Sequence, residues 1–484
     1  MSGLLDRFAR ACGTAVIDAH GEHGYDELRE RAARVAARVG DGRGRRVGIL
    51  ASPGAHFASA FFGVVSSGAC AVVLSPLHPA AESAFFCDDA DVDLVFVTAD
   101  QLERARAFVG SRPIIKLEDL AVVGAPREIA ATDQPALMLY TSGTTGKPKG
   151  AVLTHGNLSV QQELLRESWG LHEHDVLVHA LPLHHMHGLC IALLSCLGAG
   201  ASVRMLPTFD AARVWDEMGR GTVFMAVPTM YRKLALALDA AEPDVRARWE
   251  RNATSLRLAT SGSAALPATL AERWRAVTGK VPLERFGMTE IGVGLSNPLD
   301  GERRTGTVGM PLRTVETRVN EGSGELLVRG PSVFREYFRR DEATAHAFVR
   351  HGDDSWFLTG DTVARDERGY FRILGRTSVD ILKSGGYKLS ALEIEEALRD
   401  HEAVSDVAVI GVPDETWGDR VVACVVVRQG KALDPATLRA FAKERLASYK
   451  CPKDVIMLED LPRNAMGKVQ KPALVALVSG KPLS

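Results

Sequence analysis

The sequence predicts an α/β protein in which a large N-terminal domain is followed by a small α+β domain. Three observations support this prediction. The chain has 484 residues, which is too long for a single hydrophobic core. Helical and apolar strand patterns alternate along most of its length, as in domains with largely parallel strands. Near residue 376 this alternation gives way to a compact pattern, so we expect domains at residues 1–376 and 377–484.

Helix and strand patterns alternate from the start of the chain. Residues 25–39 carry apolar side chains at helical spacing, and residues 46–50 form an apolar run typical of a buried strand. Residues 57–74 lack charge but contain glycine and serine, so we expect a buried helix, a glycine turn and a buried strand rather than a membrane span. Further strands are expected at residues 92–99, 136–140, 150–155, 175–183, 223–228 and 256–266.

The predicted C-terminal domain has its own helix signals. Ser390 and Glu393 form a capping-box pattern ahead of a helix that runs to about Arg399. Two strand patterns follow, at residues 405–413 and 419–427. Asp434 and Pro435 then begin a second helix, expected to extend to residue 448, with proline at its first position.

Composition excludes several classes of protein. The net charge is -2 and the basic residues are scattered, so we expect neither a nucleic-acid nor a membrane partner. The seven cysteines include no C-x-x-C pair and lie mostly in apolar surroundings, which favours buried reduced thiols. The first residues are too few and too charged for a signal peptide. We therefore expect a cytoplasmic protein, as a monomer or weak dimer.

The segment "YTSGTTGKPKG", from Tyr140 to Gly150, is rich in glycine and hydroxyl groups. Backbone amides next to glycine, hydroxyl donors and a lysine suit a bound phosphate. The segment is not a P-loop, because only two residues separate Gly143 from Gly146 and Pro148 follows the lysine. A surface hairpin loop between two strands is the alternative, but the many hydroxyls favour phosphate binding.

This segment resembles the signature of the adenylate-forming superfamily, which contains acyl-CoA synthetases, aryl-CoA ligases, luciferases and the adenylation domains of peptide synthetases. Further segments resemble the other motifs of that superfamily, in the same order and over nearly the whole chain. They are "LPLHHMHGL" (181–189), "SGSAAL" (261–266), "RFGMTE" (285–290), "WFLTGD" (356–361), "GRTSVDILKSGGYKLSALEIE" (375–395) and "PRNAMGKVQK" (462–471).

The resemblance implies a large domain of layered α/β subdomains and a mobile C-terminal domain that rotates about a hinge near Ser378. That position is often Asp or Lys in the family, so the serine is a departure. The implied reaction has two steps: a carboxylate attacks the α-phosphate of ATP and releases pyrophosphate, and the thiol of coenzyme A then attacks the acyl adenylate. ATP, Mg²⁺ and coenzyme A are the implied cofactors, together with a small carboxylic acid.

The resemblance also implies roles for individual residues. The catalytic residues would be Lys468, His185, Glu290 and Thr289, and the metal ligands Thr141 and Glu290. ATP would be bound by Thr141, Ser142, Gly143, Thr144, Thr145, Gly146, Lys147, Gly262, Ser263, Ala264, Arg285, Phe286, Gly287, Met288, Thr289, Asp361 and Arg376. Coenzyme A would be bound by Lys383, Ser384, Gly385, Gly386, Tyr387 and Lys388. His184, His185 and His187 have no further ligand at metal-binding spacing, so we expect no metal there.

Several of these segments resemble malonyl-CoA synthetases, so we expect malonyl-CoA or methylmalonyl-CoA as the product. The second carboxylate of such a substrate needs a cation. Arg285 is the favoured candidate, because it directly precedes an active-site motif, and Arg232 and Arg303 are others. The remaining substrate-binding residues would be Met186, His185, Ser261 and Val293. Two alternatives remain open: an acyl- or aryl-CoA ligase for a monocarboxylic acid, and a stand-alone adenylation enzyme that loads a carrier protein.

Overall fold

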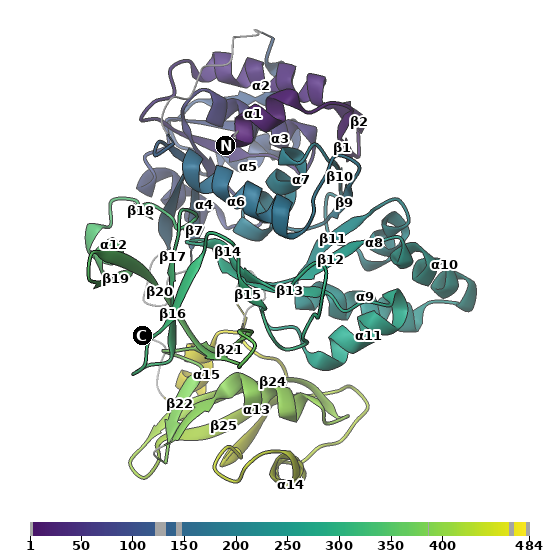
Figure 1. The fold of residues 1–484 in the computed structure, drawn as a ribbon, viewed down its shortest axis with the longest axis vertical. Coiled ribbons are helices and arrows are strands. Elements are labelled where there is room, and N and C mark those ends of the chain that lie inside the picture. The colour runs from purple at the N-terminus through teal and green to yellow at the C-terminus, as the bar shows by residue number, and fades with distance from the viewer. Residues whose placement is uncertain (1–2, 122–131, 142–147, 386, 464–468, 481–484) are drawn as a thin grey trace. The chain divides into compact units, whose positions relative to one another are not determined.

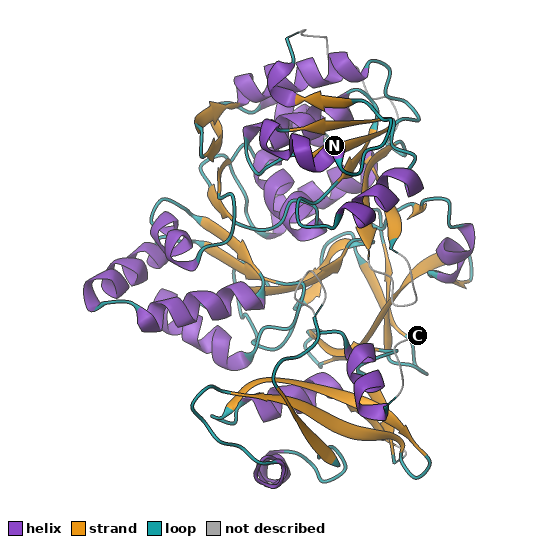
Figure 2. Ribbon diagram, turned by 180° about the vertical axis from the view of Figure 1, so that it is seen from behind, coloured by secondary structure: helices purple, strands orange, loops and turns teal. Residues whose placement is uncertain are grey.

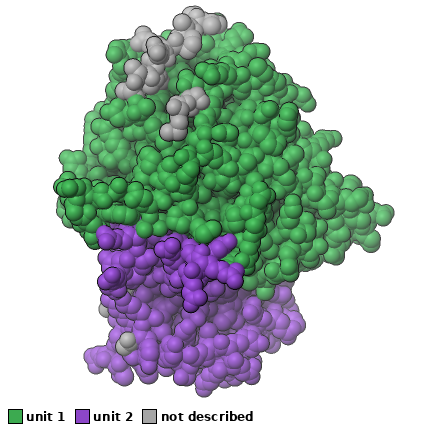
Figure 3. Space-filling view, in the orientation of Figure 1, with its two compact units in different colours: residues 1–317, 328–357 green, residues 318–327, 358–484 purple. Residues whose placement is uncertain are grey.

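The computed structural model describes residues 3–121, 132–141, 148–385, 387–463 and 469–480. The chain divides into two compact units (Figure 3). The first contains Met1–Thr317 and Val328–Phe357, and the second contains Arg318–Leu327 and Leu358–Ser484. The predicted α/β class, with a large N-terminal and a smaller C-terminal domain, is confirmed, while the division at residues 376–378 stays a prediction.

The first unit contains a nine-stranded mixed sheet (Figure 1). Its central strands are parallel, and the strands at both ends of the sheet are antiparallel to their neighbours. In spatial order the strands are β15 (Met310–Pro311), β14 (Gly292–Ser296), β13 (Leu283–Met288), β12 (Leu258–Ser261), β11 (Val223–Ala226), β9 (Val176–His179), β10 (Ser202–Met205), β1 (Thr14–Asp18) and β2 (Gly21–Gly24).

A second sheet of this unit has seven strands. Three of its parallel strands, β3, β4 and β5, consist almost entirely of buried residues, as expected for parallel strands covered on both faces. In spatial order the strands are β18 (Glu336–Tyr337), β8 (Lys149–Thr154), β7 (Pro135–Thr141), β4 (Cys70–Val73), β3 (Arg46–Leu50), β5 (Leu94–Val97) and β6 (Ile114–Lys116). The expected strands on either side of the glycine- and hydroxyl-rich segment are β7 and β8, which pair antiparallel as a hairpin.

Helices connect these strands and are distinguished from them by colour in Figure 2. They are α1 (Leu4–Arg10), α2 (Tyr25–Val39), α3 (Ala55–Ser66), α4 (Ala80–Asp89), η1 (Ala99–Gln101), α5 (Leu102–Arg106), η2 (Leu117–Asp119), α6 (His155–Ser168), η3 (His187–Leu194), α7 (Ser195–Gly198), α8 (Ala211–Met218), α9 (Pro228–Ala240), α10 (Pro243–Thr254), α11 (Ala268–Thr278) and α12 (Asp341–His346). The charge-free run at residues 57–74 forms most of buried α3 and strand β4, as predicted. Within the described residues no helix is both long and apolar enough to cross a bilayer.

Five further strands follow the nine-stranded sheet in the chain. They are β16 (Glu316–Val319), β17 (Glu325–Arg329), β19 (Phe348–His351), β20 (Asp354–Arg365) and β21 (Phe371–Arg376). The start of β20 pairs antiparallel with β19. The end of β20 pairs antiparallel with β21, and this pairing places Asp361 opposite Arg376.

The second unit is built on a five-stranded sheet with helices on both faces. In β24 and β25, alternate residues enter two separate hydrophobic clusters. Val407 and Val409 join the cluster that includes residues of α13 and α14, whereas Ala408 and Ile410 join the cluster that includes Leu474 of α15. The elements are β22 (Ile381–Ser384), β23 (Tyr387–Ser390), α13 (Ala391–Arg399), β24 (Val404–Asp414), β25 (Gly418–Val427), α14 (Pro435–Arg445), β26 (Asp454–Leu458) and α15 (Lys471–Ser479).

The helix signals of this unit are largely confirmed. Ser390 caps α13 by accepting a hydrogen bond from Glu393 N, while the Glu393 carboxylate pairs with Lys450. Asp434 caps α14 by accepting hydrogen bonds from the backbone amides of residues 436 and 437. The prediction that this helix extends to residue 448 is wrong, because it ends at Arg445, where the following residue has extended backbone.

Candidate active site

The carboxyl ends of neighbouring parallel strands carry several of the predicted site residues. β9 ends at His179 and β12 ends at Ser261, and β11 pairs in parallel with both strands. β13, which carries Arg285, pairs in parallel with β12 on its other side. Ligands of open α/β sheets bind outside the carboxyl ends of such strands, so this edge of the nine-stranded sheet is the candidate site.

His187 lies against the segment that follows β12. Its Nδ1 is 3.3 Å from the Oγ of Ser263, and Ser263 has a φ of 68°, in the left-handed region that non-glycine residues rarely adopt. Burial, helped by the charge of Arg285, lowers the pKa of His187 well below 6.5. His187 also begins the π-helix η3, a geometry often found at functional sites. The segments after β9 and β12 and the side chain of Arg285 therefore converge.

Arg285 has a buried guanidinium that is not fully hydrogen-bonded. The residue is 3% exposed, and within the described part of the chain neither Nε nor Nη2 has a partner. A Cβ on Gly262 would lie 2.4 Å from Cζ, so the guanidinium fills the space beside this glycine. Burial lowers the pKa of Arg285 to about 9. A buried cation with unsatisfied donors is costly, and the arrangement therefore suits an anionic ligand.

Three other buried polar atoms lie on β12 or on the segment that follows β9. They are Thr260 Oγ1 and Ser261 Oγ on β12, and Nε2 of His187, and none has a hydrogen-bond partner among the described residues. Buried polar atoms in proteins are nearly always hydrogen-bonded to protein or water. Each of these atoms can therefore accept or donate a hydrogen bond to a ligand or ordered water, with Thr260 and Ser261 facing opposite sides of the sheet.

Glu290 is buried and hydrogen-bonded from a second sheet. It is 4% exposed, and the hydroxyl of Tyr337 on β18 donates to its Oε1 at 2.8 Å. The ring of Tyr337 in turn lies 5.4 Å from Nζ of Lys149 at the start of β8. Thr141, at the end of β7, donates from its hydroxyl to the carbonyl of Lys149 at 3.5 Å. The predicted metal ligands Glu290 and Thr141 are thus linked through Tyr337 and Lys149.

The chemistry of Glu290 fits one kind of metal. Magnesium usually binds through one or two carboxylates together with substrate phosphates and water. In the described residues no group of three or more His, Cys, Asp or Glu side chains could hold a metal ion. A single buried carboxylate therefore fits a magnesium ion held mainly by a nucleotide, and it does not fit a metal held by protein ligands alone.

Asp361 and Arg376, both predicted to bind ATP, form an ion pair in the second unit. Nε of Arg376 lies 3.3 Å from Oδ1 of Asp361, and Nη1 donates to the carbonyl of Thr359 at 2.7 Å. Asp361 is 7% exposed. The two residues face each other across the antiparallel pair β20–β21, so their relative position is set by the sheet rather than by side-chain flexibility.

Five of the predicted coenzyme A residues belong to the hairpin of β22 and β23: Lys383 and Ser384 end β22, Gly385 follows, and Tyr387 and Lys388 begin β23. Gly385 has a φ of 57°, and a Cβ there would lie 3.3 Å from the ring of Trp417. Tyr387 is 54% exposed and stacks on Tyr449 with ring centroids 4.4 Å apart. Lys388 donates from Nζ to the carbonyl of Gly322 at 2.6 Å. Exposed aromatic rings of this kind are suited to stacking against a flat ligand.

The other predicted residues have varied surroundings. Met186, Gly262 and Val293 are buried, whereas Phe286, Gly287, Met288 and Thr289 are half-buried and Ser263 and Ala264 are exposed. His185 is half-buried with its ring 4.0 Å from that of His184. The predicted residues Ser142, Gly143, Thr144, Thr145, Gly146, Lys147, Gly386 and Lys468 lie outside the described residues.

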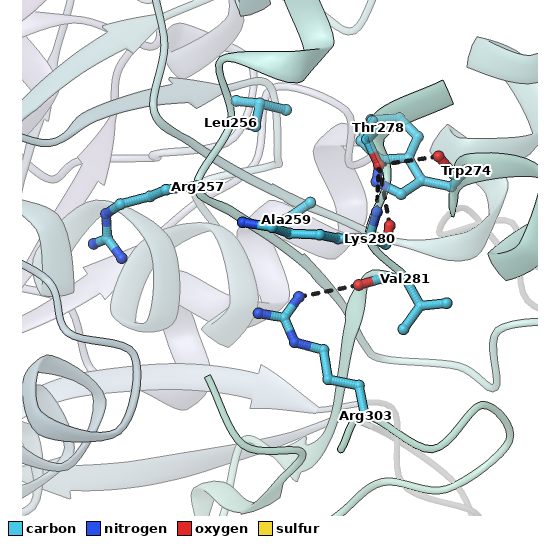
Figure 4. Close-up of a pocket in the computed structure, with 8 residues that line it drawn as sticks. All are labelled: Leu256, Arg257, Ala259, Trp274, Thr278, Lys280, Val281 and Arg303. Carbon is cyan, nitrogen blue, oxygen red and sulfur yellow. Dashed lines mark hydrogen bonds between the residues drawn. The ribbon is translucent and has the colours of Figure 1, made fainter. Parts of the chain in front are cut away.

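Two of the three arginine candidates differ from Arg285. Arg232 is exposed on α9. Arg303 lines a small pocket in which its Nη1 donates to the carbonyl of Val281 at 3.0 Å (Figure 4). Its other nitrogens donate to the carbonyls of Pro298 and Leu299. Arg303 therefore ties backbone segments together, and Arg285 alone of the three is both buried and incompletely hydrogen-bonded.

Sequence reasoning did not assign a role to His187, Gln161 or Tyr337. Gln161 on α6 is buried and accepts a hydrogen bond from Val293 N at 2.8 Å, and within the described part of the chain its Nε2 has no partner. No local pattern marks these residues, because their importance comes from contacts with segments far away in the chain. For His187 the only signal is its place two residues after His185.

Comparison with known proteins identifies the family. The AMP-binding enzyme model matches residues 7–338, and the model of the C-terminal domain of AMP-binding enzymes matches residues 393–468. A mitochondrial malonate–CoA ligase of Mus musculus is 42% identical over 95% of this chain and 88% of its own length. A malonate–CoA ligase of Arabidopsis thaliana is 39% identical over 89% of this chain and 78% of its own.

Solved structures of related ligases are also similar to this chain. ATP-bound MatB from Rhodopseudomonas palustris is 35% identical, covers 98% of both chains and has a TM-score of 0.88. A malonyl-CoA ligase with bound methylmalonyl-CoA and AMP is 38% identical, covers 96% of this chain and 98% of its own, and has a TM-score of 0.68.

One sequence-based prediction is contradicted by these comparisons. The relatives from mouse, human and cattle are named as mitochondrial, so the prediction of a cytoplasmic protein is wrong. That prediction rested on the composition of the first residues and on the reduced cysteines, and neither feature distinguishes cytosol from other reducing compartments.

Proposed function

The chain belongs to the AMP-binding enzyme family and is an AMP-forming acid–CoA ligase, and we propose that malonate is its acid, with methylmalonate as a second substrate. The products would be malonyl-CoA, AMP and pyrophosphate. One observation carries the choice of acid: Arg285 has a buried guanidinium whose Nε and Nη2 have no partner among the described residues. A monocarboxylate would leave this cation uncompensated.

The geometry around Arg285 favours the carboxylate of malonate that does not react. Guanidinium and carboxylate groups pair through two parallel hydrogen bonds. The imidazole of His187, which interacts electrostatically with Arg285, supplies a further polar group, since its Nε2 has no partner among the described residues. Buried Val293 and Met186 would limit the size of a substituent on the carbon between the two carboxylates. These features support a short dicarboxylate rather than a long acyl chain.

In the first half-reaction the reacting carboxylate attacks the α-phosphate of ATP. Negative charge develops on the phosphoryl oxygens, so cations and hydrogen-bond donors near them lower the barrier. We assign this role to Lys468 and Thr289, and the binding of the leaving phosphates to the segment from Thr141 to Lys147. Asp361 would accept hydrogen bonds from the ribose, with its carboxylate oriented by Arg376.

Magnesium, when bound with ATP, would neutralise phosphate charge beside Glu290. The hydroxyl of Tyr337 keeps the Glu290 carboxylate oriented toward this role.

In the second half-reaction the thiol of coenzyme A attacks the acyl adenylate and AMP leaves. The hairpin of β22 and β23 would lie alongside the pantetheine arm, because Gly385 has no side chain and lets the backbone approach the ligand closely. Tyr387 and Tyr449 expose a pair of stacked rings at this hairpin. His185 would lie along the path between the acyl group and the thiol.

The test is acid-dependent AMP formation with Mg-ATP and coenzyme A across malonate, methylmalonate, acetate, butyrate and benzoate. We expect malonate to have the highest kcat/KM. Arg285→Ala should lower kcat/KM for malonate by roughly 10- to 100-fold, because a hydrogen-bonded charge pair contributes about 1.5–3 kcal/mol, and should leave acetate unaffected.

Arg251→Ala is the matched control, since Arg251 is exposed on α10. A preference for a monocarboxylate, or an equal loss for malonate and acetate in Arg285→Ala, would contradict the proposal.

A further inference from the structure

Three charged side chains meet in the interior of the second unit. Lys471 is the first residue of α15 and is only 8% exposed. Its Nζ lies 2.5 Å from Oδ1 of Asp380 and 2.7 Å from Oε1 of Glu395. Burial alone would lower the pKa of Lys471, but the two carboxylates raise it overall, so the ammonium stays charged.

Each carboxylate of this cluster is also bound by backbone, but to different parts of the unit. Oδ2 of Asp380 accepts a hydrogen bond from Arg376 N at 2.9 Å, at the end of β21. Oε1 of Glu395 accepts one from Val409 N at 2.8 Å, in the middle of β24. Asp380 therefore connects Lys471 to β21, whereas Glu395 connects it to the core of the C-terminal sheet.

The turn after β21 is shaped around Asp380. Gly375 has a φ of 131°, and a Cβ on it would lie 2.3 Å from Cβ of Asp380. The backbone N–H of Asp380 donates to the carbonyl of Arg376 at 2.8 Å, and Ala391 N donates to the carbonyl of Asp380 at 2.8 Å. The carboxylate of Asp380 is thus held in one position, and Lys471 has one place to bind it.

The contacts continue from Arg376 to Asp361, its ion-pair partner on β20. An unbroken series of polar contacts therefore leads from Asp361 through Arg376 and Asp380 to Lys471. In the sequence Lys471 follows Lys468 by three residues. The series joins the residue proposed to bind the ribose to the segment that follows the lysine proposed to act at the α-phosphate.

Stability alone does not explain this cluster. Replacing a buried ion pair with apolar side chains of similar volume is often neutral or stabilising, whereas charged groups in fixed geometry specify one arrangement. The cluster also carries two carboxylates for one ammonium, which is not the composition that minimises the desolvation penalty. A function in fixing position accounts for both features.

We propose that Lys471 is a positioning residue for adenylation: by binding Asp380 it fixes the start of α15, which follows Lys468 by three residues in the sequence, relative to Asp361. This inference rests on the proposed roles of Lys468 and Asp361. A displacement of about 1 Å at a reacting group can cost roughly 100-fold in rate. Loss of the Lys471–Asp380 contact should therefore slow acyl-adenylate formation, while the attack of coenzyme A on preformed acyl adenylate, which does not use Lys468, continues.

The experiment compares two matched variants, Asp380→Asn and Glu395→Gln. Each turns one carboxylate that binds Lys471 into an amide, and only Asp380 lies on the path to Arg376. The readouts are malonate-dependent ATP–pyrophosphate exchange, thioester formation from chemically prepared malonyl adenylate, and the thermal midpoint. We expect Asp380→Asn to lower exchange by roughly 10- to 100-fold with little effect on thioester formation, and Glu395→Gln to leave the ratio of the two rates unchanged.

Lys471→Arg and Lys471→Met provide a second comparison. Arginine keeps the charge and should recover part of the exchange rate that methionine loses. Equal losses in both half-reactions, or equal behaviour of Asp380→Asn and Glu395→Gln, would overturn the proposal and leave the cluster a purely structural feature. If the wild-type enzyme shows no malonate-dependent exchange, the proposed substrate is wrong; repeating the comparison with the acid that supports exchange then tests Lys471 independently.

Discussion

The guanidinium of Arg285 lies directly against Gly262, so closely that a Cβ on the glycine would be 2.4 Å from Cζ. The two residues come from neighbouring parallel segments, Gly262 just after β12 and Arg285 within β13. The absence of a side chain at one position thus makes room for the buried cation at the other.

Gly262→Ala should therefore displace the Arg285 guanidinium. We expect the KM for malonate to rise by roughly tenfold or more, because a charge-assisted hydrogen bond contributes about 1.5–3 kcal/mol. Steady-state kinetics with malonate and acetate measure this effect. Gly322→Ala is the control, since its nearest neighbour would be a side-chain oxygen at 3.4 Å. An unchanged malonate KM in Gly262→Ala would mean that the guanidinium does not bind the acid.

The affinity for malonate should depend on pH through Arg285. Burial lowers the pKa of this arginine to about 9, and only the protonated form attracts a carboxylate. The KM for malonate should therefore be constant below this value and rise as the pH passes through about 9, while the KM for acetate stays flat. Measuring both acids between pH 7 and 10 separates the effect from general loss of activity; parallel curves for the two acids would contradict it.

The buried histidines should not titrate in the working range of pH. Burial lowers the pKa of His179 to about 4, and burial with the charge of Arg285 lowers that of His187 well below 6.5. Both remain neutral at pH 6 and at pH 8. His187→Gln should consequently reduce kcat/KM by the same factor at both values. A reduction that is clearly larger at pH 6 would show that His187 is protonated there.

The ion pair of Asp175 and Arg257 should contribute to stability without affecting catalysis. Asp175 is fully buried, and its carboxylate binds Arg257 and the hydroxyl of Thr222. Removing one partner of a buried pair costs about 3–5 kcal/mol, so Asp175→Ala should lower the free energy of unfolding by that amount in urea titrations. Glu103→Gln, which removes a carboxylate exposed at the surface, should change it by less than about 1 kcal/mol.

The same aspartate gives stability a defined dependence on pH. Burial alone would raise the pKa of Asp175, but hydrogen bonds from Arg257 and Thr222 hold it below 3.8 overall. A lowered pKa in the folded state stabilises the protein above 3.8, and this contribution disappears as the pH falls through the folded value. The difference in unfolding free energy between the wild type and Asp175→Ala should therefore shrink below pH 4 and be constant between pH 6 and 8.

Much of the fold could be predicted because its causes are local in the chain. The apolar spacing of residues 25–39 gives α2 its buried stripe with the predicted bounds, and the side chain of Ser390 caps α13 by binding a backbone amide only three residues further along the chain. The end of α14 was less predictable. The residues after Arg445 can continue a helix by propensity alone, whereas Leu446 has extended backbone and packs against the hydrophobic cluster of α13 and α14.

The sequence motifs were also sufficient to identify the family and its reaction, because the glycine, hydroxyl and charged residues of each motif lie within a few positions of one another. They did not determine which of Arg285, Arg232 and Arg303 is buried and incompletely bonded. The three arginines differ in their tertiary surroundings: Gly262 lies beside Arg285, Arg232 is exposed on α9, and three backbone carbonyls surround Arg303.

The Lys471 cluster is the clearest example of a feature that the sequence alone does not reveal. Its lysine and aspartate are 91 residues apart in the chain, in two different motifs, and nothing local in the sequence pairs one with the other. The sequence alone determined the periodic elements, their caps and the order of the motifs, since these depend on neighbours within a few positions. Only the tertiary structure decided which charges are buried and paired, because burial depends on segments that approach one another after the chain has folded.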